Sequence, residues 1–297
     1  MQLPQTPAAI IPSQCVLGEG PVWDDWQQCL WFTDIQQSQL LRWDHAGGRL
    51  DRFRLPERLG SIALSDDPDV LVLALASGFA CFRPATGHLA WLHRIEPVYR
   101  GIRMNDGRVD RQGRFWAGSM VEDAGLAPPE AGSLYRLDPP GRAPPAVLRR
   151  GIAIANSTCF SPDGQWAYFA DTPTRQIRRH ATNGDFGHGM LFVETRGDGW
   201  PDGSDVDAAG RLWNAEWGAA RISVYHPDGS LAARLPLPVS QPTCVAFGGA
   251  DFTTLFVTSA REGLPTDAEP QAGNVLVFEG VPPGLPANRF PLAATHG

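Results

Sequence analysis

Residues 105–119 read NDGRVDRQGRFWAGS, and residues 202–216 repeat the pattern as DGSDVDAAGRLWNAE. Each stretch has a short strand-like run, a tight turn that ends in Gly, and a second run rich in aromatic residues. Two more stretches have the same pattern: EGPVWDDWQQCLWFTD at 19–34 and NSTCFSPDGQWAYFAD at 156–171. The chain therefore uses one supersecondary unit several times.

Two weaker copies of the unit begin at Gly60 and Gln241. After each copy the chain continues into another pair of strand-like runs. Six units of about 40–50 residues with four strands each are typical of a propeller. We predict an all-β fold, a six-bladed β-propeller that forms a single domain over residues 1–297. The ring must close, and we expect the segment from Ala8 to Val16 to pair with the last blade.

The composition excludes several classes of function. Among 297 residues the net charge is -7, without a basic cluster that would follow a phosphate backbone, so we expect no nucleic-acid partner. No apolar stretch is long enough to span a bilayer, and the first residues lack the basic start of a signal peptide, so we expect no membrane partner. The five cysteines are scattered without a CxxC pair, which favours reduced thiols and a cytoplasmic protein.

One position recurs five residues before the Asp or Ser that opens each turn. In the four clear copies it holds an oxygen-bearing side chain: Glu19, Asn105, Asn156 and Asp202. This position opens the innermost strand of each blade, so its side chains converge on the channel axis. Hard cations prefer a ring of side-chain oxygens, and a divalent cation relieves the repulsion between two carboxylates. The repeat predicts a metal site in the central channel.

Each of these residues alone has a structural alternative, because Asp and Asn commonly cap turns. We interpret Asp24, Asp110 and Asp207 as turn formers for that reason. The agreement in position across the blades is what favours a metal over capping.

Several motifs resemble one known family. They are GEGPVWDD at 18–25, RMNDGRVDRQGRFWAGSM at 103–120, PDGSDVDAAGRLW at 201–213 and SAREGL at 259–264. Together they are similar to the gluconolactonase family that includes regucalcin, also called senescence marker protein. The resemblance covers nearly the whole chain.

The resemblance implies a six-bladed propeller that is a metal-dependent lactonase. It assigns the metal ligands to Glu19, Asn156 and Asp202, and substrate contacts to Arg103 and Asn105. Ser157 stands where the family usually has Gly. Asp123 stands where some members have a substrate-contacting Glu, with Glu122 beside it, so both are predicted substrate-binding residues.

A lactone is a cyclic ester, and its hydrolysis builds negative charge on the carbonyl oxygen, which a Lewis-acidic cation stabilises. We predict Asp202 as the general base, with Asp123 or Glu122 as alternatives. Arg103 suits the hydroxyl groups of a polar substrate, although a salt bridge to a loop is an equal alternative. Ca²⁺ is our first choice of ion, and Zn²⁺, Mn²⁺ and Mg²⁺ stay open.

We expect a sugar lactone (an aldonolactone) as the small-molecule partner, and a monomer or weak homodimer. Two alternatives stay open: a metal-dependent hydrolase of aryl esters or organophosphates, and a non-catalytic calcium-binding regulatory protein. The polar residues named above favour a polar pocket. The segment 120–132 is long for a propeller connection and leaves the ring on the side of the site, which is typical of a lid, with a plain surface loop as the open alternative. Most tryptophans are assigned to the core between blades and not to sugar-stacking surfaces, with Trp200, Trp217 and His226 left open as exceptions.

Overall fold

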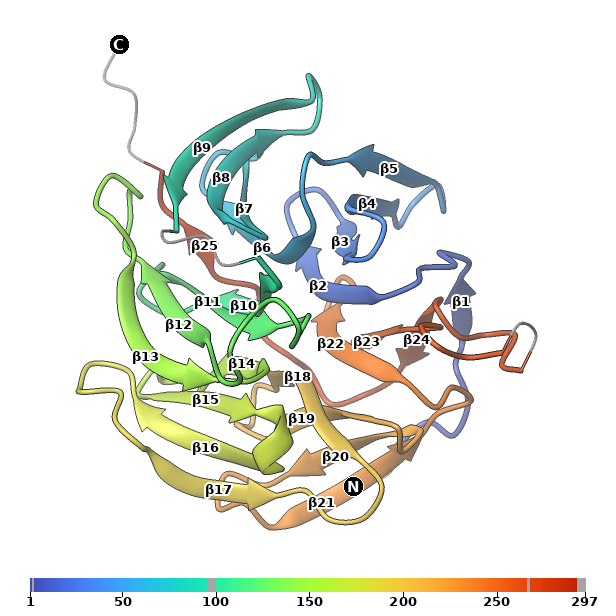
Figure 1. The fold of residues 1–297 in the computed structure, drawn as a ribbon. Helices are drawn as coiled ribbons and strands as arrows, with labels where there is room; N and C mark the ends of the chain where they lie inside the picture. Colours follow the sequence, from blue (N-terminus) through green and yellow to red (C-terminus); the bar gives the residue numbers. More distant parts are fainter. Residues whose placement is uncertain (2, 96–99, 266–267, 293–297) are drawn as a thin grey trace.

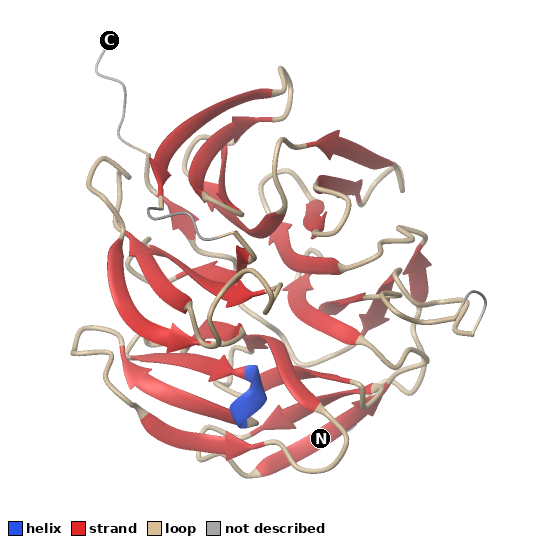
Figure 2. Ribbon diagram, in the orientation of Figure 1, coloured by secondary structure: helices blue, strands red, loops and turns tan. Residues whose placement is uncertain are grey.

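The computed structural model describes residues 1, 3–95, 100–265 and 268–292. Among these residues nearly all regular structure is strand, and one helical turn occurs, the 3-10 helix η1 (Thr172–Thr174) (Figure 2). Six blades of four antiparallel strands each surround a central axis, and in five of them the first strand along the chain is the innermost of the four (Figure 1). The predicted six-bladed β-propeller is confirmed. No helix in the described part of the chain is long and apolar enough to cross a membrane.

Five blades are built from four consecutive strands each. The first contains β2 (Gly18–Asp24), β3 (Cys29–Asp34), β4 (Gln39–Asp44) and β5 (Leu50–Arg54). The second contains β6 (Leu59–Ser65), β7 (Leu71–Leu75), β8 (Gly78–Arg83) and β9 (His88–Arg94). The third contains β10 (Ile102–Val109), β11 (Phe115–Val121), β12 (Gly132–Leu137) and β13 (Ala146–Ile152). The fourth contains β14 (Ala155–Phe160), β15 (Trp166–Asp171), β16 (Gln176–Ala181) and β17 (Met190–Glu194). The fifth contains β18 (Trp200–Val206), β19 (Leu212–Trp217), β20 (Arg221–Tyr225) and β21 (Leu231–Pro236).

The last blade closes the ring with strands from both ends of the chain. It contains β22 (Pro242–Gly248), β23 (Thr254–Ser259) and β24 (Val275–Glu279), and its outermost strand is β1 (Ala9–Ile11). β1 pairs antiparallel with β24, with Ile11 opposite Val275. The predicted closure is confirmed, because β1 lies within the expected segment. Hydrogen bonds between the two ends of the chain hold the ring shut.

Two copies of the recurring turn are built around a buried aspartate. Asp110 accepts hydrogen bonds from the backbone of Gln112 and Arg114 and from Trp116 Nε1 (2.8 Å). Asp207 makes the same contacts with the backbone of Ala209 and Arg211 and with Trp213 Nε1. The tryptophans are fully buried between blades, so their indole N–H groups need an internal acceptor. These aspartates are turn formers, as interpreted from the sequence.

A strand near the C-terminus was not predicted. β25 (Arg289–Phe290) pairs parallel with β6, the innermost strand of the second blade. It belongs to residues 281–292, which we call the C-terminal strap. The strap crosses the end of the channel where the innermost strands finish: Ala208 N donates to Pro283 O, and Asn288 Nδ2 donates to Val109 O.

Candidate active site at one end of the channel

The innermost strand of every blade is bulged at the same place. In all six blades the pairing of the first strand with the second shifts register around the recurring position. A β-bulge re-aims side chains and is common beside active sites. The bulges place the side chains of Glu19, Asn105, Asn156 and Asp202 at one end of the channel, which we call the site end.

Glu19 and Asp202 face each other at the site end, and both are buried, with 5% and 7% of their surfaces exposed. Burial, reinforced by the charge of Asp106, raises the pKa of Glu19 to about 8. Burial and the charge of Glu19 raise the pKa of Asp202 well above its ordinary range. Two buried carboxyl groups in contact cannot both ionise without an added positive charge, and a divalent cation supplies one.

Two asparagines and an arginine continue the polar group. Arg103 Nη1 donates to Asn105 Oδ1 (2.6 Å), and Asn105 Nδ2 donates to Asn156 Oδ1 (3.0 Å). Asn156 Nδ2 donates to Thr172 Oγ1 (2.8 Å), which donates to Pro201 O beside Asp202. Burial lowers the pKa of Arg103 to about 10, and it therefore stays charged at neutral pH. This chain of hydrogen bonds fixes the side chains of two blades relative to each other and to the backbone of a third.

The donor set fits a hard cation. Glu19 and Asp202 supply carboxylate oxygens, and Asn156 supplies an amide oxygen, which is the chemistry that calcium and magnesium prefer. Within the described residues, no group of three His, Cys, Asp or Glu side chains is placed to hold a metal. The predicted set differs from such a group because its third member is a carboxamide. The contact between two buried acids on the floor of one cavity is the structural observation that favours a cation here.

A cavity of about 390 Å³ opens above these residues. Glu19, Arg103, Asn105, Asn156 and Asp202 contribute polar atoms to it. The rest of its described lining is mainly apolar: Leu17, Met120, Ile154, Pro173, Trp200 and Trp217, with Thr172 and Glu262. The expectation of a polar pocket therefore holds for the floor and not for the walls.

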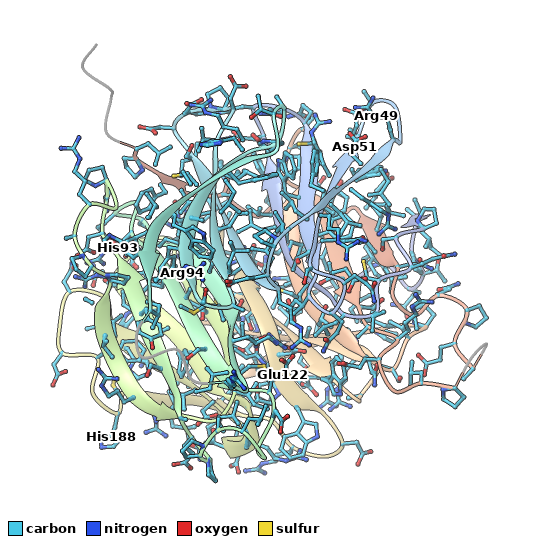
Figure 3. All side chains as sticks on the ribbon, turned by 45° about the horizontal axis from the view of Figure 1, so that its top comes forward. Arg49, Asp51, His93, Arg94, Glu122 and His188 are labelled. Atoms are coloured by element: carbon cyan, nitrogen blue, oxygen red, sulfur yellow. The ribbon has the colours of Figure 1, made fainter. Side chains whose placement is uncertain are left out.

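Glu122 and Asp123 lie outside the described lining of this cavity. Glu122, labelled in Figure 3, accepts a hydrogen bond from Arg103 Nε (2.9 Å) and forms an ion pair with Arg58. Asp123 is exposed, and its carboxylate accepts a hydrogen bond from Gly125 N. Their loop begins where β11 ends and is anchored by hydrogen bonds to Gly101 O. Contact of either acid with substrate stays a prediction, and the contact seen for Glu122 is with Arg103.

The sequence left the role of the two tryptophans of the wall undecided, although the repeat contained a signal for one of them. Arg103 lies two residues before Asn105, and the same step back from Asp202 reaches Trp200. The equivalent residues of two other blades, Leu17 and Ile154, also line the cavity. Position minus two of the repeat thus forms the wall above the polar floor. Trp217 lies directly opposite Trp200 in the β18–β19 pairing.

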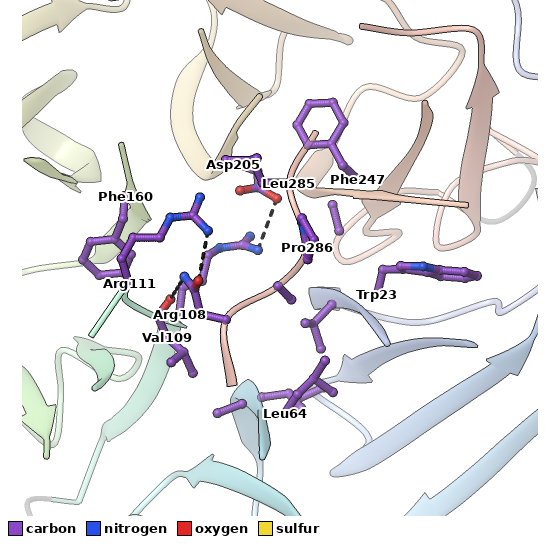
Figure 4. Close-up of a pocket in the computed structure, with 16 residues that line it drawn as sticks. Trp23, Leu64, Arg108, Val109, Arg111, Phe160, Asp205, Phe247, Leu285 and Pro286 are labelled. Carbon is purple, nitrogen blue, oxygen red and sulfur yellow. Dashed lines mark hydrogen bonds and ion pairs between the residues drawn. The ribbon is translucent and has the colours of Figure 1, made fainter. Parts of the chain in front are cut away.

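At the other end of the channel, which we call the far end, charges are paired within the protein. Arg108 Nη1 lies 3.4 Å from Asp205 Oδ2, and Arg108 Nη2 donates to Ser204 O and Val245 O. Burial lowers the pKa of Arg108, but the charge of Asp205 outweighs this and the net shift is upward. Figure 4 shows the strap, with Leu285 and Pro286, passing beside this pair.

Known proteins match this chain along most of its length. The sequence model of the SMP-30/Gluconolactonase/LRE-like region matches residues 17–261. The chain belongs to this family. An L-arabinolactonase of Azospirillum brasilense is 41% identical over 284 residues, covering 92% of each chain. A 6-deoxy-6-sulfogluconolactonase of Pseudomonas putida is 37% identical, covering 87% of this chain and 88% of the relative.

Solved structures of the family share the fold. A regucalcin from Agrobacterium tumefaciens, described as a calcium-binding protein, superposes with a TM-score of 0.86 at 32% identity, covering 97% of this chain and all of that one. The family resemblance predicted from the sequence is confirmed.

Proposed function

We propose that this protein hydrolyses a sugar lactone to the corresponding aldonic acid and uses a divalent cation as Lewis acid. The enzyme class, a lactonase, follows from its place in the family and from relatives named as sugar lactonases. The observation that carries the cation is the contact between two buried acids, Glu19 and Asp202, on the floor of a cavity of about 390 Å³. That cavity exceeds the volume of a five- or six-carbon lactone.

Glu19, Asn156 and Asp202 would hold the cation. When bound, it supplies Lewis acidity for the carbonyl oxygen on which negative charge develops. Ca²⁺ is our first choice because all donors are oxygen, and Mg²⁺, Mn²⁺ and Zn²⁺ remain to be compared.

The chain's own residues supply the proton transfer and the orientation. Asp202, buried on the floor of the cavity, takes the proton of the attacking water and returns it to the ring oxygen when the ester bond breaks. Arg103 and Asn105, held together by their 2.6 Å hydrogen bond, orient the substrate's hydroxyl groups. Glu122 fixes Arg103 from the side away from Asn105, so it acts on the substrate through Arg103.

The test is hydrolysis, followed as proton release near neutral pH, across aldonolactones, aliphatic lactones and an aryl ester. The purified protein is assayed after chelation and again with each of the four ions restored. Turnover of a sugar lactone that chelation abolishes and one ion restores is the expected result. Asp202→Asn should lose that turnover. Asp198→Asn, an exposed aspartate just before the same strand, is the matched control and should retain it.

The apolar walls favour a second candidate, an aryl-ester hydrolase. Faster turnover of the aryl ester than of every sugar lactone would establish it. If no ester or lactone is hydrolysed with any ion, while Ca²⁺ still binds, the protein is a calcium-binding regulator and the catalytic proposal is wrong.

A further inference from the structure

Trp200 is exposed at the wall of the cavity yet firmly held. It keeps 36% of its surface exposed. The guanidinium carbon of Arg175 lies 3.7 Å from the centre of its ring. Arg175 Nη1 in turn donates to Gly197 O (2.7 Å) and Gly199 O (3.0 Å), in the loop just before Trp200. A cation over one indole face and a tied loop fix the ring in one orientation.

The indole ring of Trp200 lies in the same cavity as the proposed catalytic residue. Trp200 lines the cavity together with Trp217, its partner across the β18–β19 pairing, and with Pro173. Two residues further along β18 is Asp202, on the floor of the cavity. Arg175 covers one face of the indole, so a ligand in the cavity can contact only the other face and the edge. Exposed aromatic surface costs free energy unless something covers it, and a ligand in the cavity would do so.

We propose that Trp200, supported by Trp217 and braced by Arg175, is the surface on which the C–H face of the lactone ring packs. The electron-rich face of an aromatic ring attracts the weakly positive C–H groups of a saturated ring. Arg103 and Asn105, from another blade, then form hydrogen bonds with the hydroxyl groups of the lactone. The wall therefore determines specificity for a cyclic polyol lactone that has one C–H face and one hydroxylated edge. This inference rests on the proposed lactonase function.

The chain offers a matched control for this arrangement. Trp26 is 54% exposed and has the guanidinium carbon of Arg289 3.5 Å from its ring centre. It lies in the turn after β2, beyond Asp24 and away from the site end. Trp26 and Trp200 thus share exposure and a stacked arginine, and they differ because Trp200 lines the cavity at the site end and Trp26 does not.

The first measurement is steady-state kinetics of Trp200→Ala, Trp200→Phe, Arg175→Ala and Trp26→Phe with a five-carbon aldonolactone and an aryl ester. Loss of one aromatic contact should raise KM for the lactone about tenfold in Trp200→Ala and leave kcat within about twofold. Trp200→Phe should restore most of the affinity, and Arg175→Ala should have an intermediate effect as a positioning residue. Trp26→Phe should match the wild type. An unchanged lactone KM in Trp200→Ala, or a change confined to the aryl ester, would overturn the proposal.

The second measurement is tryptophan fluorescence of the calcium-loaded protein during titration with 1,5-anhydro-D-glucitol, a sugar ring without an ester. We expect a change in emission that disappears in Trp200→Phe and persists in Trp26→Phe. This readout needs no turnover, so it separates the two proposals. If the wild type hydrolyses no lactone but shows this signal, the lactonase function is wrong and the sugar-binding wall stands. Absence of the signal in the wild type would overturn the wall.

Discussion

The two ends of the channel are built from the same strands but differ in how their buried charges are paired. β10 carries Asn105 to the site end and Arg108 to the far end, and β18 carries Asp202 and Asp205 in the same way. At the far end Arg108 and Asp205 neutralise each other. At the site end Asp202 meets another acid and has a raised pKa. Asp205 at the far end has an arginine partner, whereas Asp202 at the site end contacts Glu19, because the guanidinium of Arg103 bonds to Asn105 and Glu122 instead. A bound cation would neutralise this pair of acids.

The largest effect is expected from a substitution that changes the site end and leaves the far end intact. Asp202→Asn keeps the shape of the side chain but removes its charge and its ability to accept a proton. We expect kcat/KM for the sugar lactone to fall about 10³-fold or more, as for loss of a general base. Steady-state kinetics with each ion restored measures this.

The companion change at the far end is Asp205→Asn, three residues along the same strand. It should keep kcat/KM within about threefold of the wild type and lower thermal stability instead, because it leaves Arg108 unpaired. Equal losses of activity in the two variants would mean that the ends do not differ as described.

Calcium should stabilise the protein more at high pH than at low pH. The folded, ion-free protein binds protons at Glu19 and Asp202 more tightly than the unfolded chain does, since their folded pKa values are raised. The stability that those protons give is complete below about pH 4 and is lost as pH rises through the folded value of Glu19, about 8. Calcium replaces the protons, so its stabilising effect should grow across this window. At a hundredfold excess over Kd it is worth about 2.7 kcal/mol.

Thermal unfolding with and without Ca²⁺, between about pH 5 and pH 8, measures this effect. Asp202→Asn is the control, because it removes one of the two acids and should flatten the pH dependence. A calcium-induced shift in Tm that is equal at both pH limits would show that neutralising these acids is not what the ion does.

The far end should respond in stability and not in catalysis. Arg108→Met keeps the apolar length of the side chain but leaves Asp205 without its partner in a largely buried place. We expect the free energy of unfolding to fall by about 2 kcal/mol. Denaturant unfolding measures it, and the lactonase assay on the same preparation should give an unchanged kcat. A large loss of activity at unchanged stability would extend the site to the far end.

The same comparison explains what the sequence could predict. The sequence could predict that Glu19, Asn156 and Asp202 lie together, because a recurring position converges on the axis and this depends only on the repeat. Trp200 was within reach of the same reasoning, applied two residues earlier. The ion pair of Glu122 with Arg58 depends on a contact between two blades that no local pattern encodes.

The strap illustrates the limit of local patterns. Its strand, Arg289–Phe290, has two residues and lies in a Pro-rich stretch, so neither alternation nor length signals it. Its position is fixed by distant partners, because Arg289 Nη2 donates to Asp24 Oδ1 (2.7 Å) and Asp25 Oδ1 (2.8 Å).

The smallest expected effect concerns backbone strain at Ser157, in the bulge that follows Asn156 at the site end. Ser157 follows Asn156 with φ 58°, while Gly20 follows Glu19 with φ 55°, so equivalent bulges carry a serine and a glycine. The left-handed conformation costs a non-glycine residue about 1 kcal/mol. In return, the buried Ser157 hydroxyl donates to Asp202 O (2.6 Å) and ties two ligand-bearing strands together.

Two substitutions at Ser157 separate the cost of the backbone strain from the contribution of the hydroxyl group. Ser157→Ala keeps the strain and loses the hydroxyl, which donates to Asp202 O and accepts from Ser204 Oγ and Asn214 Nδ2, so the ion-free protein should be destabilised by about 1 kcal/mol or more. Ser157→Gly loses the same hydrogen bonds but also the strain, so it should be the more stable of the two variants by about 1 kcal/mol. Denaturant unfolding of the ion-free protein measures both. Weaker Ca²⁺ binding in both variants, by titration calorimetry, would show that the hydroxyl positions the site end. Equal stability of the two variants would show that the serine at φ 58° carries no strain and that the bulge itself sets the backbone.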